Sequence, residues 1–240
     1  MSESAGKASR ATKRSASDTP PTPPPKPERP VYNAEVISAW QFGMATAGAL
    51  LIGALYLVLP LDLLVGPRWL LLVLEVVLLA PLVIARAMGY HLSHRVARLL
   101  SYGLLAALTL QLVISLVKLV QNLPRLSPQV LLTSGVLLWG ANILIFATWY
   151  WETDGDGPVS RHHRNHEPVD FRFTQQEDGA PHNWRPGFID YLFLAFCTAT
   201  ALSPADTLPL TRRAKVLMMV EAIISMIVIV LLVARFVNIV

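Results

Sequence analysis

Six uninterrupted apolar stretches follow one another along the chain, separated by short polar or proline-containing connections. They cover residues 37–59, 69–85, 99–120, 130–151, 188–202 and 212–237. A helix needs about 17 to 25 apolar residues to cross the hydrocarbon core of a bilayer, and all but one of the stretches reach that length. The exception, 188–202, is short enough to be a half-helix that re-enters on the side it came from. We therefore predict an all-α fold, a polytopic helical membrane bundle with six hydrophobic helices.

The polar stretches divide the chain into four parts. Residues 1–36 form a basic tail that contains the proline-rich run 20–27, and four transmembrane helices are expected over 37–151. Residues 152–186 form a polar loop, and residues 187–240 hold the short apolar stretch and the last helix. The tail buries too little apolar area to offset its conformational entropy, so we predict that it is disordered. It serves as a spacer or as the ligand of a proline-reading protein partner.

Composition excludes several classes of protein. Of 240 residues, 53% are hydrophobic and 15% are charged, and the mean hydropathy is +0.47, so the expected partner is the lipid bilayer. The net charge of +4 comes from the tail and the connections, and we expect no nucleic-acid partner because no continuous basic face is predicted. The single cysteine, Cys197, cannot form an intramolecular disulfide. No apolar core of a signal peptide precedes residue 37.

The lysines and arginines predict an orientation. They gather in the tail, in the connection 86–98 and in the loop 152–186, whereas the first and third connections carry only Arg68, Lys118 and Arg125. Short connections rich in positive residues stay in the cytoplasm. We therefore expect a multi-pass protein whose N-terminus is cytoplasmic.

Two carboxyl groups lie inside predicted membrane helices, Glu75 in the second and Glu221 in the last. An ionisable group at membrane depth faces the bundle interior, a water path or a partner, so each is a candidate functional residue. The alternative for each is a hydrogen bond to a neighbouring helix, with Glu75 held neutral by desolvation. Gln111, Asn142 and Ser225 are expected to make ordinary interhelical hydrogen bonds.

No metal, cofactor or catalytic motif emerges from the sequence. Five of the six histidines are considered as metal ligands, and they lie in solvated connections without an HExxH motif or a suitably spaced carboxylate: His91, His94, His162, His163 and His166. The run 154–157 resembles the start of a calcium loop but lacks the distal glutamate, so a turn is expected. Because no nucleophile elbow, phosphate loop or dinucleotide fingerprint is present, we predict neither an enzyme nor a bound cofactor.

The last quarter of the chain, residues 188–237, resembles the pore helix, filter and inner helix of bacterial two-transmembrane potassium channels. The matching residues are 190–196, 206–211, 214–215, 221–224 and 233–235, with no gap between them. The whole chain also looks like a group of uncharacterised bacterial multi-span membrane proteins with Trp-Tyr-Trp-Glu, here 149–152, and Asp-Tyr-Leu, here 190–192. The resemblance implies the bacterial cell membrane and a pore-loop segment made of Ala201, Leu202, Ser203, Pro204, Ala205 and Asp206.

This segment departs from the channels at the filter itself. Where the channels have Thr-Val-Gly-Tyr-Gly-Asp, residues 201–206 read Ala-Leu-Ser-Pro-Ala-Asp. The filter glycines supply positive φ angles that aim carbonyl groups at the ion. Ser203 and Ala205 adopt such angles reluctantly, and Pro204 holds φ at about −65°. A potassium-selective filter is therefore not expected.

The resemblance and the charge pattern disagree on topology. In the channels the pore helix enters from outside, whereas the charge pattern places the residues before 188 in the cytoplasm. We prefer the interpretation in which 188–202 crosses as a short fifth span and leaves 203–211 outside, although this also places Arg212, Arg213 and Lys215 there. Five spans with a re-entrant 188–202 is the alternative.

The functional expectation is a pore-loop-derived membrane protein, channel-like or transport-like, without the potassium filter. The alternative is a non-transporting membrane scaffold or accessory subunit. A homo-oligomer with 203–206 around an axis would favour the pore, and a protomer with no polar path among its helices would favour the scaffold. Asp206 is expected either to hold the turn before Pro209 or to join a ring of carboxylates at a pore mouth.

Overall fold

The structure is a computed structural model that describes residues 34–88, 94–163, 167–176, 184–201 and 207–237. The predicted tail falls outside these residues except for 34–36, where the first helix has already begun. The elements in chain order are α1 (Ala34–Val58), η1 (Leu61–Leu63), α2 (Trp69–Ala87), α3 (His94–Asn122), α4 (Pro128–Thr153), η2 (Asp154–Asp156), α5 (Pro158–His163), β1 (Phe171–Phe173), η3 (Thr174–Gln176), α6 (Phe188–Ala199), β2 (Thr207–Pro209) and α7 (Arg212–Val237). A helix stands at each of the six predicted apolar stretches.

The predicted membrane class is confirmed in its general form. Within the described residues, three helical stretches are long and apolar enough to cross a membrane: Arg95–Asn122, Pro128–Asp156 and Arg212–Arg235. The other apolar helices qualify over shorter stretches, Gly43–Val58, Trp69–Pro81 and Phe188–Ala199. Large apolar side chains stay exposed along α7, such as Met219, Met226 and Val230. A surface of this kind is expected where a helix faces lipid.

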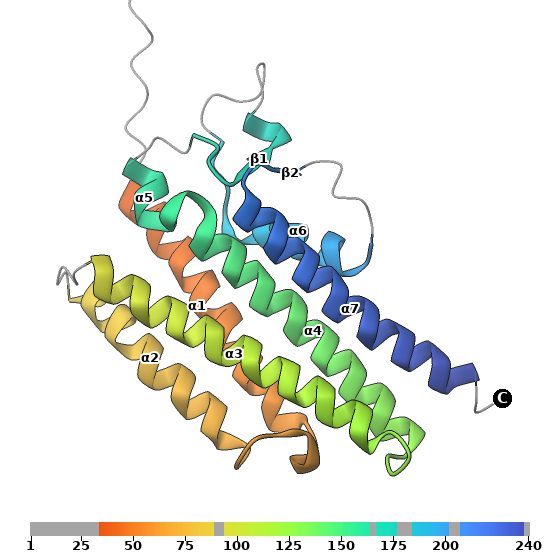
Figure 1. The fold of residues 1–240 in the computed structure, drawn as a ribbon. Helices are drawn as coiled ribbons and strands as arrows, with labels where there is room; N and C mark the ends of the chain where they lie inside the picture. Colours follow the sequence, from red (N-terminus) through yellow and green to blue (C-terminus); the bar gives the residue numbers. More distant parts are fainter. Residues whose placement is uncertain (1–33, 89–93, 164–166, 177–183, 202–206, 238–240) are drawn as a thin grey trace, which may run out of the picture. The chain divides into compact units, whose positions relative to one another are not determined.

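Helix α4 is the centre of the packing, because α3, α6 and α7 all lie against it (Figure 1). The helix begins with a local signal: Ser127 caps it by accepting a hydrogen bond from the Val130 amide at 3.4 Å, and Pro128 occupies the first turn. Leucines of α3 and α4 form much of the core between these two helices. The fully buried ones are Leu108, Leu112, Leu119 and Leu138.

Two contacts define the two ends of the bundle. At one end, Arg98 near the start of α3 pairs with Asp156 just after α4, at 2.8 Å. At the other end, Lys118 near the end of α3 donates a hydrogen bond to the carbonyl group of Leu64, after η1. We call these the polar end and the far end. Since α3 starts and α4 stops at the polar end, the two helices are antiparallel.

The polar stretch 152–186 is more ordered than the loop that the sequence predicts. It contains α5 and the strand β1, and β1 pairs with β2 in an antiparallel two-stranded sheet with Arg172 opposite Leu208. Phe171 and Phe173 are buried and the residue between them is exposed, which is the alternation expected of a strand with one covered face. The all-α fold expected from the sequence did not include this strand pair. Strands of three residues are too short for a period to show in the sequence.

This strand pair also fixes the path of the chain around α6. Because β1 precedes α6 and β2 follows it, the chain enters and leaves α6 at the polar end. The 12 residues of α6 span about 18 Å, and the Phe196 ring meets the Trp139 ring of α4 at a centroid distance of 6.2 Å. Trp139 lies near the middle of α4. Helix α6 therefore reaches about halfway along α4 before the chain returns to the polar end, which is the path that the re-entrant alternative describes.

Candidate functional site

The candidate site is the hairpin formed by α6 and β2, together with the polar contacts that anchor it. The sequence folds α6 with one covered face, since Phe188, Tyr191, Leu194 and Ala195 are buried and follow the spacing of a helix face. Asp190 starts the helix by accepting a hydrogen bond from the Gly187 amide at 2.6 Å. At the entrance, the Phe188 ring packs edge-on against Trp151 of α4.

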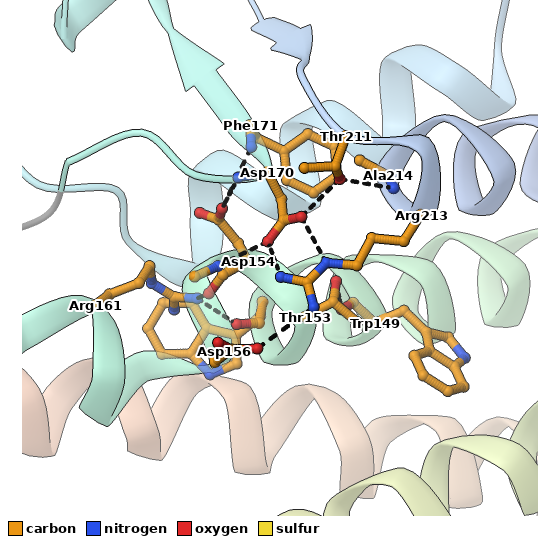
Figure 2. A network of polar contacts seen from close by, with 12 residues as sticks. Trp149, Thr153, Asp154, Asp156, Arg161, Asp170, Phe171, Thr211, Arg213 and Ala214 are labelled. Atoms are coloured by element: carbon orange, nitrogen blue, oxygen red, sulfur yellow. Dashed lines mark hydrogen bonds and ion pairs between the residues drawn. The ribbon is translucent and has the colours of Figure 1, made fainter. Parts of the chain in front are cut away.

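Asp154 joins three elements at the point where α4 ends (Figure 2). Its Oδ1 accepts hydrogen bonds from the amides of Asp170 and Phe171 at 3.1 and 3.3 Å. Its Oδ2 accepts a bond from the hydroxyl group of Tyr191 on α6 at 2.5 Å. Because each oxygen has a partner, this buried carboxyl is well satisfied. The side chain ties the end of α4 to β1 and to the start of α6.

Asp170, just before β1, holds the start of α7. Its Oδ1 accepts bonds from Thr211 Oγ1 and Arg213 Nε, both at 2.6 Å. Its Oδ2 accepts bonds from the Gly155 amide at 2.9 Å and from Arg213 Nη2 at 2.5 Å. Figure 2 shows the Arg213 guanidinium reaching between Asp170 and Asp156. The two-pronged arginine contact is both strong and orienting.

Burial alone would raise the pKa of Asp170. The hydrogen bonds from Arg213, Thr211 and the Gly155 amide, with the positive charge of Arg213, more than offset that effect, so the pKa of Asp170 lies below its ordinary value. The carboxyl group is therefore ionised at neutral pH and pairs with a cation.

Arg161 of α5 completes the arrangement from the opposite side. It is 3% exposed, and its Nη1 donates to the carbonyl groups of Trp151 and Asp154 at 2.6 and 2.7 Å. Its guanidinium also lies 4.5 Å from the centre of the Trp151 ring. A cation at these last carbonyl groups suits the negative end of the α4 dipole. Gly155 has φ of +57°, and a Cβ there would lie 2.8 Å from Arg161 Cγ, so both the turn and the arginine require glycine.

We call this set of side chains, Asp154, Arg161, Asp170, Tyr191 and Arg213, the polar-end anchor. Its carboxylate oxygens all accept bonds from the protein itself. The arrangement fixes where α6 and β2 leave the rest of the structure, which is a positioning role. Sequence reasoning missed these residues because their partners lie far apart in the chain. One signal was available: paired arginines at 212–213 begin a helix, where positive charge is unfavourable unless a carboxylate faces it.

The tip of the hairpin lies at the end of α6. Thr198 and Thr200 donate hydroxyl hydrogen bonds back to the carbonyl groups of Leu194 and Phe196, at 2.9 and 2.8 Å. Ala201 follows with φ of +56°, the left-handed conformation in which a helix commonly stops. Its side chain is exposed. Of the predicted pore-loop residues only Ala201 is described; Leu202, Ser203, Pro204, Ala205 and Asp206 lie outside the described residues, so the roles expected for Asp206 remain predictions.

The intramembrane carboxyl group of Glu221 lies between α4 and α7, where one of its oxygens has a hydrogen-bond partner and Oε1 has none among the described residues. It is fully buried, and its Oε2 accepts a hydrogen bond from the hydroxyl group of Tyr150. Asn142 donates to Ser225 Oγ at 2.8 Å and to the Glu221 carbonyl group at 3.3 Å. The interhelical bond expected of Asn142 and Ser225 is therefore present. These contacts match the structural alternative for Glu221.

Glu75 is in a different situation. It is fully buried, and in the described part of the chain neither carboxyl oxygen has a hydrogen-bond partner. The carboxyl group lies directly against the backbone of Gly53 on α1, where a side chain at position 53 would overlap it. Gln111, expected to bond between helices, instead donates to Ser115 on its own helix at 3.1 Å.

The histidines considered as metal ligands lie outside the part of the chain whose side chains are described. Within that part, no group of three histidine, cysteine, aspartate or glutamate side chains gathers as metal ligands would. The run 154–157 forms the expected turn, as η2. Comparisons with protein-family models, with curated proteins and with solved structures found no match to this chain. The resemblance to the channels therefore remains a prediction.

Proposed function

We propose that this chain is a pore-loop-type integral membrane protein, channel-like or transport-like, that acts as a homo-oligomer with the α6 tips around a common axis. The observation that carries the proposal is the exposed end of α6 at about half the depth of the bundle. Ala201 is exposed there and has left the helix.

The topology that fits is five crossings, α1, α2, α3, α4 and α7, with α6 re-entrant. The polar end then carries Arg98, Arg161, Arg212, Arg213 and Lys215, whereas the far end carries fewer positive side chains. This asymmetry supports a cytoplasmic position for the polar end in a bacterial cell. If 188–202 crossed the membrane as a fifth span, the three positive residues at 212, 213 and 215 would lie outside, against the usual charge distribution. The re-entrant arrangement keeps them in the cytoplasm.

Because the tip of α6 lies at membrane depth, its backbone needs either water or another protein beside it. Hydrocarbon cannot hydrogen-bond a peptide group, so backbone that is not helical is tolerated at membrane depth only where protein covers it or water reaches it. Ala201, which follows the last turn of α6 and is not helical, is exposed on the surface of the protomer. Either a second copy covers it or it lines a water-filled path. Several copies arranged around an axis satisfy both conditions.

The expected flux is not selective for potassium. The glycines of the resembled filter are replaced at 203 and 205, and proline stands at 204. The hairpin also enters from the cytoplasmic end, opposite to the pore helix of the channels. We therefore propose a passage for small cations or solutes in which pore dimensions and side-chain polarity set the selectivity.

A flux assay tests the proposal directly. Purified protein in liposomes should release potassium and sodium at comparable rates, and its stoichiometry in detergent should exceed one copy. A reversal potential that follows the potassium gradient alone would contradict the unselective passage. A monomer without any flux would refute the pore.

Two single-cysteine variants test whether the tip of α6 lies on a water-filled path. In a Cys197→Ala background, Ala201→Cys should react with a membrane-impermeant thiol reagent and cross-link between copies. Val136→Cys is the matched control, because Val136 is 52% exposed and lies one helical turn from Trp139, at the depth that α6 reaches. The control should react slowly because lipid covers it. Equal reaction at the two positions would show that the tip has no special access to water.

The second candidate, a non-transporting scaffold, has its own observation. In the described residues the polar side chains between α4 and α7 bond to one another, and the best-defined cavity has mainly apolar side chains around it. One protomer therefore shows no polar path through these helices. Under this interpretation a different protein covers the α6 tip. Cross-links from Ala201→Cys to another protein, together with the absence of flux, would support the scaffold.

A further inference from the structure

A small polar group lies inside the apolar contact between α1, α2 and α3. It consists of Tyr56, Glu75, Gln111 and Ser115, of which all but Gln111 are fully buried. Tyr56 lies beside Ser115 and close enough to Glu75 for the two to interact electrostatically. Gln111 donates to Ser115 at 3.1 Å. The group is separate from the α6 hairpin, which packs on α4 and α7.

Glu75 is the unusual member, because the helices enclose its carboxyl group without bonding to it. Neither oxygen has a donor in the described part of the chain. Both helices make room for it, since a side chain at Gly53 would overlap Oε2 and would also come within 2.8 Å of Leu72 Cδ1. An ionised carboxylate in this position would lose its hydration and gain nothing in return. The carboxyl group therefore carries a proton at rest.

The other charged groups around this region leave Glu75 without a counter-ion. On α1 the titratable neighbour is Tyr56. On α3 the nearby cation is Lys118, and its Nζ is occupied by the carbonyl group of Leu64. Arg68, before α2, lies at the rim of a cavity. No ion pair to Glu75 is found among the described residues.

That cavity connects the polar group with the far end. It has a volume of about 220 Å³ and is lined by Tyr56 and Gln111 at one part and by Pro67 and Arg68 at another. The polar side chains in its lining are those of Tyr56, Gln111 and Arg68, and the rest of the lining is apolar. Two members of the polar group thus line a space that extends to the turn before α2.

We propose that Glu75 is a proton-binding site within the membrane, which exchanges its proton with the far-end side through this cavity. The reaction is addition of a proton to one carboxylate oxygen with formation of an O–H bond, and its reversal. Tyr56 and Gln111 line the cavity, and both lie beside Ser115. The proposal does not depend on the pore, since it concerns a different part of the bundle.

An apolar carbodiimide tests for a protonated carboxyl group at membrane depth. The acid adds across a C=N bond of dicyclohexylcarbodiimide: a carboxyl oxygen bonds to the central carbon, the acid proton moves to nitrogen, and the adduct rearranges to a stable acylurea. The full-length protein in liposomes is labelled over a pH series and the modified peptide is identified by mass spectrometry. We expect labelling at Glu75 that declines as the pH rises.

Glu221 is the internal comparison, because its carboxyl group accepts a bond from Tyr150. A charge-assisted or strong hydrogen bond to the acid should slow its modification about tenfold relative to Glu75. Glu75→Gln should abolish labelling at the site, whereas Glu221→Gln should leave it unchanged. A Glu75 signal that is independent of pH would overturn proton exchange.

Infrared spectroscopy of the wild-type protein gives a second measurement that does not depend on access of the reagent. A protonated carboxyl group has its own carbonyl band, and the band of Glu75 should shift in heavy water, disappear on alkaline titration and be missing in Glu75→Gln. If no titrating band is lost in Glu75→Gln, the proposal is wrong. If Glu75→Gln does not fold, the wild-type protein alone is used. The proposal then requires that its carbonyl band titrates and shifts in heavy water, and that the carbodiimide label maps to Glu75.

Discussion

Asp170 offers the sharpest test of the polar-end anchor. Its carboxylate accepts four hydrogen bonds from Gly155, Thr211 and Arg213. Asp170→Asn keeps one oxygen and replaces the other with an amide that donates, so two acceptor bonds are lost, one of them from the guanidinium. A hydrogen bond to a charged group contributes about 1.5–3 kcal/mol. Arg213 is 43% exposed, so water recovers part of this, and we expect a loss of about 2–4 kcal/mol.

Asp156→Asn is the matched control. Asp156 also contacts Arg213, at 3.4 Å, and pairs with Arg98, but its side chain is 31% exposed. Exposed pairs of this kind contribute about 0–1 kcal/mol. Asp156 has φ of +65°, which asparagine tolerates as well as aspartate, so the control adds no backbone strain. For a chain of this size the melting temperature changes by about 2–4 °C per kcal/mol, giving roughly 4–16 °C for Asp170→Asn.

The pH dependence separates charge from shape. Because the pKa of Asp170 is held below its ordinary value of about 3.9, its contribution to stability is complete above that pH and is lost as the pH falls through the folded-state pKa. The difference in melting temperature between wild type and Asp170→Asn, measured in detergent, should therefore shrink at acid pH. Equal effects of the two substitutions at neutral pH, or a difference that does not change with pH, would refute this account of the anchor.

Three further predictions concern the helix contacts. Gly53→Ala should lower the unfolding free energy by about 1–3 kcal/mol through overpacking, and Glu75→Ala in the same chain should recover part of the loss, as a thermal melt of the double variant would show. Ser225→Ala should remove the bond from Asn142 and cost about 0.6–1.7 kcal/mol, so an unchanged melting temperature would contradict that bond. Ala201→Gly should raise stability by up to about 1 kcal/mol, because glycine adopts the left-handed conformation without strain; a loss would argue against this helix end.

Local pattern was enough to place the helices. The apolar stretch 130–151 and the capping sequence Ser127-Pro128 together predict α4 within two residues of its ends. The turn at 154–157 was expected from its glycines, and two of them do have positive φ. In each case the physical cause, burial or turn geometry, acts over a few neighbouring residues. Such causes are visible in one sequence.

Long-range contacts were not predictable by the same means. Asp170 and Arg213 are 43 residues apart, and β1 and β2 are separated by the whole of α6. Nothing in the local sequence specifies these pairings, because they depend on α6 turning back. The charge pattern nevertheless contained a relevant signal, because Arg212, Arg213 and Lys215 lie on the cytoplasmic side only if 188–202 is re-entrant. The resemblance to the channels favoured the crossing alternative instead.

The two intramembrane carboxyl groups show where sequence reasoning ends. Glu75 and Glu221 both stand in apolar helices, and the sequence treats them as the same kind of candidate. What separates them is one donor on another helix: the Tyr150 hydroxyl reaches Glu221, whereas the group that faces Glu75 across the interface is the backbone of Gly53. The bond from Tyr150 lets the buried acid of Glu221 stabilise the contact between α4 and α7, although its second oxygen has no partner among the described residues. The buried carboxyl group of Glu75 makes no hydrogen bond that would offset the free-energy cost of burying it. Its proton is therefore the feature of this interface that we connect with a function.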